Sequence, residues 1–430
     1  MVLALASLAG PRALLAAGAA SAAPVFRISA TIPLVAGLLN WATNKLAVLM
    51  MFYPLKFRGF ERFFGLKSKI GWQGIVPGKA KQMANKIVDD VVLRLIDLKE
   101  VFGRLPPEEI ARQLETTILE VGSGLAQDLV ERKGWSVLAG PIIRSSAFND
   151  TLRERGLALV SELVRDVQAE PAAVFDLRDV VVRGLASDPK VLVDLFERAG
   201  DKDLKFVVNS GFFLGGALGV LQALLWQVWS PWWSLALTGA AVGMVTDQLA
   251  LNLIFLPVEP IPIGPFKLQG LFLQRQAEVS EEFSDFIVEN VLTAPQLWDE
   301  LLKGSRCAAF WRLLALRVDA ALGVAPDAGL PNFAGQGLYQ ALGQEDWQWL
   351  RKEAVARMRA ALPGAVPAVY ALTDESLDLK GDMVVKMAKL SSAEFERVLH
   401  PVFEEDEWIL VLVGGALGAI FGAIQAFAGA

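Results

Sequence analysis

Long apolar stretches alternate along the chain with two much longer polar segments. A helix needs about 20 mainly apolar residues to cross a bilayer. Residues 206–226 and 232–257 meet this length, and no charged residue lies between Lys205 and Asp247. Residues 408–428 form another such stretch, and residues 28–54 form one that only Lys45 interrupts. The pattern therefore predicts four transmembrane helices.

The polar segments, residues 58–205 and 258–407, have the pattern of helical domains. Ile, Leu and Val recur every three to four residues in 108–130 and 152–167, which is typical of amphipathic helices. Residues 188–198 and 392–402 resemble short capped helices that lead toward spans. No segment alternates convincingly as a strand does, and residues 323–343, rich in Gly, Pro and Ala, are expected to form a long loop. The predicted fold class is an all-α membrane protein.

Positive charge beside the spans predicts the orientation of the chain, because short flanking segments rich in Lys and Arg stay on the cytoplasmic side. Basic residues flank the spans on the side of the two polar segments, among them Lys56, Arg58, Lys202, Lys205, Lys267 and Arg275. The turn at 227–231 has none, and its Trp and Pro suit a membrane interface. Both polar segments are therefore expected on one side, the cytosol or its organellar equivalent.

The two halves of the chain resemble each other at fixed offsets, which is the sign of an internal repeat. Residues 42–54 align without gaps on 245–257 at an offset of 203. The same offset pairs Gly211, Gly215, Gly219 and Gln222 with Gly414, Gly418, Gly422 and Gln425. At an offset of 196, Gln73-Gly74 falls on Gln269-Gly270, and Ile87, Val91 and Leu95 fall on Phe283, Ile287 and Val291.

The chain is accordingly predicted to contain two tandem repeats in the same orientation, each a transmembrane helix, a helical soluble domain and a second transmembrane helix. The first covers residues 28–230, with spans 28–54 and 206–226 around the helical domain 58–205. The second covers 231–430, with spans 232–257 and 408–428 around the helical domain 258–407. Residues 1–27, which contain no acidic residue, are either a targeting leader or a membrane-associated tail.

Polar side chains inside the predicted spans are the main candidates for function, because such groups are costly in lipid and face protein or water. They are Asn40, Thr43, Asn44, Lys45, Gln222, Thr246, Asp247, Gln248 and Gln425. One interpretation is a central polar cluster in which Lys45 pairs with Asp247 across the repeat axis. The other, which we favour, is hydrogen bonding between helices, with Lys45 extending to the interface.

Glycines four residues apart predict where the spans pack. Gly211, Gly215 and Gly219 lie on one helix face, as do their counterparts Gly414, Gly418 and Gly422. Without Cβ atoms, two helix backbones approach closely and gain van der Waals contact in lipid. Each of these faces is expected to pack against another helix.

Composition excludes several functional classes. The formal net charge of −6 is spread along the chain, so there is no basic surface for nucleic acid. The single cysteine, Cys307, forms no internal disulfide, and one cysteine with one histidine, His400, argues against a zinc or Cys–His catalytic site. No nucleotide-binding or nucleophile motif occurs. We therefore expect no enzyme activity, no catalytic residue, no metal and no cofactor.

A basic stretch with interleaved aromatics follows the first span, from Lys56 to Lys81, and includes Phe57 and Trp72. It has two interpretations, which the sequence leaves open. Contact with anionic lipid headgroups is one. The other is the positive charge that ordinarily flanks a span on its cytoplasmic side.

Three motifs resemble a known family. They are Thr43 to Pro54 (Thr-Asn-Lys-Leu-Ala-Val-Leu-Met-Met-Phe-Tyr-Pro), Gly74-Ile-Val-Pro77, and a glycine-rich last span ending in Gly422-Ala-Ile-Gln425. The chain is similar in these to the membrane proteins catalogued as domain of unknown function 445. In the second copy Asp247 stands where the pattern has Asn, and Phe272-Leu273 replaces Val-Pro. The resemblance implies a membrane protein and no established activity.

The sequence favours a non-enzymatic membrane scaffold or tether whose helical domains bind partners or lipid. The alternative is a transporter of a small solute, an ion or a lipid that uses the intramembrane polar cluster, as an oligomer because four spans make a small pore. The lipid bilayer is the expected partner, and protein partners and a homo-oligomer stay open. The expected location is a bacterial inner membrane or an organellar membrane, of a plastid or mitochondrion.

Overall fold

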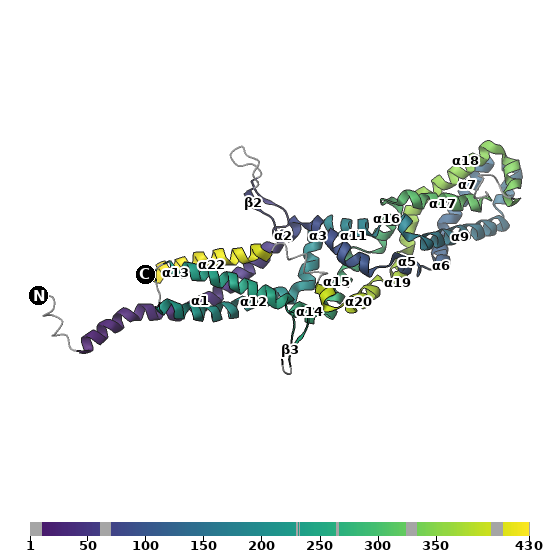
Figure 1. Ribbon diagram of the computed structural model, residues 1–430. Helices are drawn as coiled ribbons and strands as arrows, with labels where there is room; N and C mark the ends of the chain where they lie inside the picture. Colours follow the sequence, from purple (N-terminus) through teal and green to yellow (C-terminus); the bar gives the residue numbers. More distant parts are fainter. Residues whose placement is uncertain are drawn as a thin grey trace. The chain divides into compact units, whose positions relative to one another are not determined.

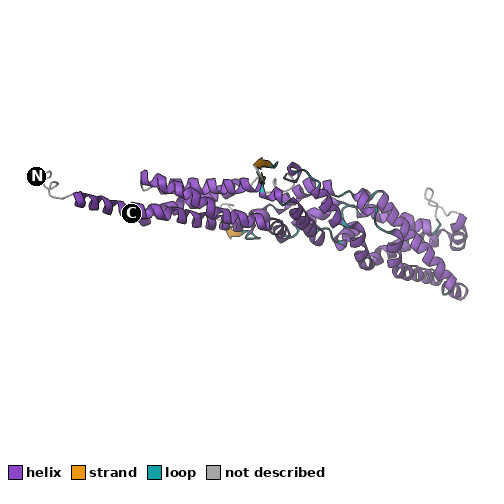
Figure 2. Cartoon of the chain, turned by 90° about the horizontal axis from the view of Figure 1, so that it is seen from below, coloured by secondary structure: helices purple, strands orange, loops and turns teal. Residues whose placement is uncertain are grey.

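The computed structural model describes residues 11–60, 70–228, 231, 233–263, 266–323, 333–396 and 407–429. Within these ranges the chain is built from helices, with four strands of three residues each, which confirms the all-α prediction (Figure 2). Its contacts divide it into two units. We call Met1–Ile87, Asp188–Phe283 and Met387–Ala430 the membrane unit, and Val88–Ser187 and Ser284–Lys386 the helical unit.

The membrane unit contains four long helices and two short hairpins (Figure 1). The long helices are α1 (Pro11–Phe52), α12 (Pro189–Val228), α13 (Ser234–Phe255) and α22 (Glu407–Gly429). The hairpins are β1 (Arg58–Phe60) with β2 (Ile70–Trp72) and β3 (Ile261–Ile263) with β4 (Phe266–Leu268). Short helices follow them: α2 (Ile75–Gly78), α3 (Ala80–Ile87), α14 (Leu271–Gln274) and α15 (Gln276–Asn290), whose last turns belong to the helical unit.

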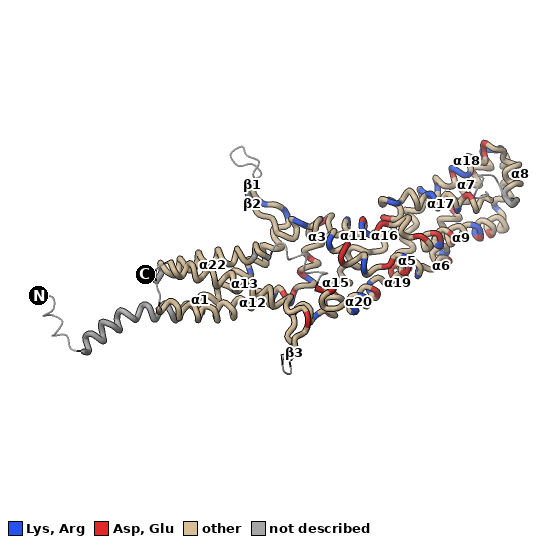
Figure 3. The backbone as a smooth tube through the Cα atoms, viewed as in Figure 1, with Lys and Arg blue, Asp and Glu red and all other residues tan. Residues whose placement is uncertain are grey.

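Three helices are long and apolar enough to cross a membrane: Thr31–Phe52 within α1, α12 and α13. The chain is therefore a membrane protein. The fourth predicted span, 408–428, lies in α22, whose apolar part Val411–Phe427 is shorter. Figure 3 shows the apolar parts of these helices almost free of charged residues, whereas the first half of α12 and the helices of the helical unit carry many. Residues 1–10 and residues 229–230 of the predicted 227–231 turn lie outside the described residues.

The four long helices pack in two antiparallel pairs, α1 with α12 and α13 with α22. Pair one places Gly211 against Asn40 and Gly219 against Ala36, so the two helices run in opposite directions. Pair two places Gly243 against Gly414 and Gly239 against Gly418, with the same result. The pairs also contact each other through α12 with α13 and α1 with α22.

Helix α12 corrects one prediction, because residues 188–198 are not a separate short helix. They begin one continuous helix that runs to Val228. Asp188 accepts a hydrogen bond from the Lys190 N–H at 2.9 Å at its start. Buried residues then recur at three- to four-residue spacing through the charged part and the apolar part alike, including Leu192, Phe196, Ala199, Asp203, Gly211, Gly215 and Gly219. With one buried face throughout, nothing interrupts the helix.

The hairpins correct a second prediction, that no strands occur. In β1–β2, Arg58 pairs with Trp72, and in β3–β4, Ile261 pairs with Leu268, both antiparallel. A cis-proline, Pro54 or Pro257, lies four residues before the first strand of each hairpin. A strand of three residues is too short to produce a recognisable alternation, which explains why the sequence pattern misses both hairpins.

The same local structure follows each hairpin. The Gly74 N–H donates to the Pro54 carbonyl at 3.0 Å, and the Gly270 N–H donates to the Pro257 carbonyl at 3.0 Å. A Cβ on Gly74 would lie 2.6 Å from the Phe52 backbone, and one on Gly270 would lie 2.5 Å from a backbone carbonyl oxygen of α13. Glycine is required at both positions, because a side chain would collide with the end of the preceding transmembrane helix.

The adjacent glutamines also make equivalent bonds. Gln73 Nε2 donates to the Leu55 carbonyl at 2.9 Å, and Gln269 Nε2 donates to the Val258 carbonyl at 3.1 Å. Each glutamine ties the segment after its hairpin to the segment before it. The residues that the sequence aligned, Gln73-Gly74 and Gln269-Gly270, therefore occupy equivalent local structures.

The helical unit is made of shorter elements. Its first segment contains η1 (Val88–Val92, a π-helical turn), α4 (Leu93–Leu95), α5 (Leu98–Phe102), α6 (Pro107–Gln113), α7 (Glu115–Arg132), α8 (Ser136–Ile143), α9 (Ser146–Ala169), α10 (Pro171–Val174) and α11 (Leu177–Ala186). Its second contains the end of α15, α16 (Ala294–Lys303), α17 (Cys307–Ala321), α18 (Phe333–Ala365), η2 (Val366–Val369), α19 (Tyr370–Leu377) and α20 (Leu379–Ala388, to Lys386).

Several helices of this unit begin at residues whose side chains bond the first turn. Asp97 accepts from the Lys99 and Glu100 N–H groups, Ser145 accepts from the Phe148 N–H at 3.2 Å, and Thr293 forms a capping box with Gln296. Such caps satisfy N–H groups that have no partner within the helix. The Ser145 cap begins α9, the helix that contains the predicted segment 152–167, and α6 and α7 cover the predicted segment 108–130 except Leu114.

The predicted loop 323–343 is only partly a loop. Residues 324–332 lie outside the described residues, and α18 already begins at Phe333. Gly343 interrupts α18 with a φ of 76°, a conformation that suits glycine. The apolar residues that the sequence aligned at the offset of 196 are buried in both halves, because Ile87, Val91, Leu95, Phe283, Ile287 and Val291 are all at most 3% exposed.

Candidate functional site

The polar residues of α1 lie against α12 and are bonded to backbone. Asn40 Nδ2 donates to the Ala36 carbonyl at 2.8 Å, and Thr43 Oγ1 donates to the Asn40 carbonyl at 3.0 Å. Asn44 Nδ2 reaches across to the Val207 carbonyl of α12 at 2.8 Å. All three side chains are buried, so the structure places them inside the bundle, as predicted. Asn44 alone among them bonds the neighbouring helix.

Asp247 occupies the equivalent place on α13 with a different environment. It is 6% exposed, and neither carboxylate oxygen has a hydrogen-bond partner among the described residues. Its carboxylate packs directly on Gly414 of α22. Thr246 beside it is fully buried, and its hydroxyl also has no partner in the described part of the chain. A buried polar group without a partner is costly, so Asp247 needs a physical explanation.

The two glutamines lie toward the other end of the bundle. Gln222 Nε2 donates to Thr238 Oγ1 at 2.8 Å, and Thr238 in turn donates to the Ser234 carbonyl at 2.8 Å. Gln425 is half-buried, and its Nε2 has no partner among the described residues. Thr238 was missed because a lone threonine in an apolar stretch gives no signal in the sequence.

Two predicted members do not belong to the cluster. Lys45 is exposed, and its ammonium lies 5.2 Å from the centre of the Trp41 ring. Gln248 is also exposed and bonds Asn252 on its own helix at 3.2 Å. The proposed pairing of Lys45 with Asp247 is therefore wrong: one side chain faces outward and the other inward. Lys45 and Gln248 adjoin Asn44 and Asp247 in sequence, but consecutive side chains of a helix point about 100° apart.

The six glycines of the two predicted faces lie where the helices of each pair contact each other. A Cβ on Gly211 or Gly215 would lie 2.7 Å from an amide nitrogen of Asn44 or Asn40, and one on Gly219 would lie 2.8 Å from α1. A Cβ on Gly414 would overlap Asp247, and one on Gly418 or Gly422 would overlap backbone carbonyls of α13. All six glycines are therefore at close helix contacts, as the predicted faces require.

A cavity of about 90 Å³ brings Asn44 and Asp247 together. It is lined by residues from α1, α2, α3, α12, α13 and α14, and its polar lining residues are Asn44, Asp203 and Asp247. Met51 and Ile254, near the C-terminal ends of α1 and α13, line it as well. These two helices therefore run in the same direction, and equivalent residues of both face one space.

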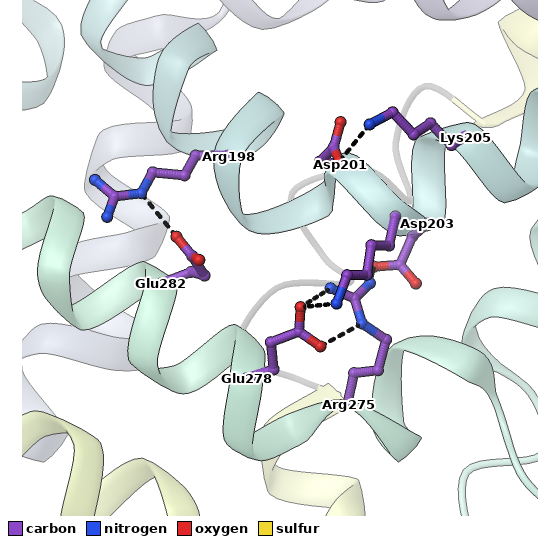
Figure 4. Close-up of polar contacts among 8 residues, drawn as sticks. Arg198, Asp201, Asp203, Lys205, Arg275, Glu278 and Glu282 are labelled. Carbon is purple, nitrogen blue, oxygen red and sulfur yellow. Dashed lines mark hydrogen bonds and ion pairs between the residues drawn. The ribbon is translucent and has the colours of Figure 1, made fainter.

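Charged residues form a network beside this cavity that the sequence did not reveal (Figure 4). Arg275 donates to Asp203 at 2.7 Å and to Glu278 at 3.1 Å, and Lys202 also contacts Glu278. The Arg275 guanidinium and the Lys202 ammonium together lower the pKa of Glu278 to about 2. Arg198 bonds Glu282 at 2.7 Å in the same region. The network joins α12 to α15 and supplies Asp203 with a cationic partner.

In the helical unit one short helix is unusual. Helix α8 has no buried residue, and Val137, Leu138 and Ile142 are 88%, 77% and 62% exposed. The other large apolar residues exposed in this unit are scattered singly, for example Leu316, which is ordinary for a protein surface. A cluster of three on one helix is an apolar patch of the kind that marks an interaction site.

Comparisons of the chain with protein-family models, with curated proteins and with solved structures found no match. The similarity to domain of unknown function 445 therefore rests on the motifs alone and stays a prediction. The basic stretch from Lys56 to Lys81 stays open as well, because residues 61–69 lie outside the described residues.

Proposed function

We propose that the chain consists of two tandem repeats in the same orientation, with four spans and both polar segments on the cytoplasmic side. Support comes from contacts that recur at the offset of 203. Gly211 packs on Asn44 and Gly414 packs on Asp247, with the same offset on both sides of the contact. The glutamine and glycine after each hairpin recur at the offset of 196.

Within this architecture we propose that the protein is a non-enzymatic membrane tether, in which the bundle holds the chain in one bilayer and α8 attaches to a second lipid surface. The exposed apolar face of α8 carries this proposal. Leu138 and Ile142 lie one turn apart on one side of the helix, and Val137, which is even more exposed, adjoins Leu138 about 100° around the helix. An apolar helix face in water gains free energy by entering the boundary between headgroups and acyl chains.

The residues around α8 suit lipid headgroups. Trp135 comes directly before the helix, and tryptophan is enriched at membrane interfaces. Arg144 comes directly after it and is exposed, so its charge is available to anionic headgroups. No charged residue lies between Lys133 and Arg144. A lipid surface therefore fits both the apolar face and its ends.

The test is capture of vesicles by the full chain in nanodiscs, in which the transmembrane bundle already has its own lipid. We expect anionic vesicles to float together with the nanodiscs. Changing Val137, Leu138 and Ile142 together to Ser should reduce capture at least about tenfold, since each buried apolar side chain contributes about 1.5–3 kcal/mol. Leu316→Ser is the matched control, because Leu316 is an isolated apolar residue, 49% exposed, in the same unit. Equal capture by both variants would make the tether proposal wrong.

A transporter is the second candidate, and the observation that favours it is the cavity lined by Asn44 and Asp247. Intramembrane acidic residues are frequent in ion and solute pathways. Proteoliposomes that contain the full chain would then pass Na⁺ or H⁺ faster than protein-free vesicles, and both Asn44→Leu and Asp247→Ala would abolish the difference. Flux no greater than in protein-free vesicles would count against ion transport.

A further inference from the structure

The cavity of the membrane unit offers acceptors without donors. Of its three polar lining residues, Asn44 and Asp247 lie on equivalent turns of α1 and α13. Asn44 is 2% exposed and Asp247 is 6% exposed, so both are shielded from bulk water. Three oxygen atoms, Asn44 Oδ1 and the two carboxylate oxygens of Asp247, have no hydrogen-bond partner among the described residues.

The orientation of the Asn44 amide is fixed by its other bond. Its Nδ2 donates to the Val207 carbonyl at 2.8 Å, and a carbonyl oxygen accepts only from a donor. The nitrogen must therefore face Val207, and the oxygen, Oδ1, is the amide atom that has no partner. A flipped amide would set two acceptors against each other. Asn44 thus contributes an acceptor, and not a donor, to the group.

Asp247 has no cation to balance it in the described part of the chain. Asp203, the other carboxylate of the cavity, is bonded to Arg275 at 2.7 Å and so has its own partner. Lys45 is exposed and lies over Trp41. Asp247 packs on Gly414, which has no side chain to donate a hydrogen bond. Its charge and its two acceptors are both left without compensation.

We propose that this cavity is a binding site for one monovalent cation, an alkali-metal ion or a primary ammonium group, held by Asp247 and Asn44. A single carboxylate balances a single positive charge. Calcium takes six to eight oxygen ligands, often from several carboxylates, and no cluster of three or more His, Cys, Asp or Glu suited to a metal occurs among the described residues. The otherwise apolar wall strengthens the attraction between the ion and the carboxylate.

The size of the cavity agrees with this ligand. About 10–15 Å³ of comparable space holds one water molecule, so 90 Å³ holds a small ion with a few waters. Waters would complete the coordination that three protein oxygens leave incomplete. The site is independent of α8 and holds whether or not the ion crosses the membrane.

The test is thermal unfolding of the purified full chain in chloride salts of Na⁺, K⁺, methylammonium and N-methyl-D-glucamine at equal ionic strength. A bound ion stabilises the folded state, so the midpoint should rise by a few degrees, saturably, in one of the first three salts compared with the bulky N-methyl-D-glucamine. The ion that gives the largest rise identifies the occupant. Identical midpoints in all four salts would overturn the proposal.

Variants separate the site from general salt effects. Asp247→Asn keeps the shape and removes the charge, so the ion-dependent rise should disappear. Gln248→Ala, the exposed neighbour on the same helix, should keep it. If Asp247→Asn does not fold, binding of radioactive sodium to the parent chain and its competition by K⁺ and methylammonium decide instead, and no saturable binding of any of these ions rejects the site. The α8 variant should keep the ion response, which separates this proposal from the tether.

Discussion

The two helix pairs of the membrane unit are both antiparallel and meet at equivalent positions, but the residues in contact differ. In α1–α12, glycines of one helix face Ala36, Asn40 and Asn44 of the other, and the amides bond to backbone. In α13–α22 the corresponding positions are Gly239, Gly243 and Asp247, so glycine faces glycine. The second pair therefore relies on direct backbone contact, and Asp247, the polar side chain at these three positions, has no partner among the described residues.

This difference teaches that close packing and hydrogen bonding are alternative ways to hold two helices together in lipid. Pair one has side-chain bonds to backbone, one of them between its helices, and pair two has closer contact of its backbones. Asp247 is then not needed for packing, which leaves its carboxylate for a ligand. Four predictions test this contrast.

The largest effect is expected from adding a methyl group where two backbones meet. Gly418→Ala in pair two would place a Cβ on the Gly239 carbonyl, and a backbone cannot move aside locally. We expect a loss of about 1–3 kcal/mol in the free energy of unfolding. Gly215→Ala in pair one should cost less, because its Cβ would mainly meet the Asn40 side chain, and its nearest backbone atom, the Ala36 carbonyl oxygen, is 2.9 Å away, a milder overlap than at Gly418.

Gly216→Ala is the control, since the Cβ would meet just the Pro33 carbonyl, at an ordinary 3.6 Å, among the described residues. It should change stability by less than about 0.5 kcal/mol. Thermal unfolding of the three variants in one detergent ranks their losses of stability. Equal losses at Gly418 and Gly215 would contradict the contrast between backbone contact and side-chain contact.

The next effect compares Asn44→Ala with Asp247→Ala, which should have opposite signs. Asn44→Ala removes the bond to Val207, and interhelical bonds in membranes are worth about 0.6–1.7 kcal/mol. Asp247→Ala removes an unpartnered buried group, so the midpoint in N-methyl-D-glucamine chloride should stay the same or rise. A fall in both variants in that salt would mean that Asp247 has a protein partner.

Much of the bundle was predictable, because its determinants are local and periodic. The glycine faces and the buried positions of Asn40, Asn44 and Asp247 follow from their spacing on a helix. The length of α12, the hairpins and the pairing of Arg275 with Asp203 did not follow. Those two residues are 72 positions apart, and no sequence pattern indicates which of many charges will meet after folding.

The third prediction concerns Glu278, whose counterpart at the sequence offset of 196 is the uncharged Gln82. Its pKa of about 2 is below the ordinary 4.5, so its contribution to stability is complete above pH 4.5 and is lost as the pH falls toward 2. Glu278→Gln should therefore lower the midpoint at neutral pH and flatten its decline in this acidic window. Circular dichroism at a series of pH values measures both, and parallel curves for parent and variant would contradict the assignment.

The smallest effect is expected from Lys45→Met, which decides between pairing and independence of the two charged residues in the spans. Since the Lys45 ammonium lies over Trp41, its loss removes a cation–π contact worth about 0.5–1 kcal/mol at an exposed site, and the longer apolar contact of Met with lipid offsets part of this. The ion-dependent rise of the unfolding midpoint should be unchanged. If Lys45 balanced Asp247, its removal would instead leave the carboxylate alone and strengthen ion binding, so a larger rise in the variant than in the parent chain would restore the pairing that the structure rejects.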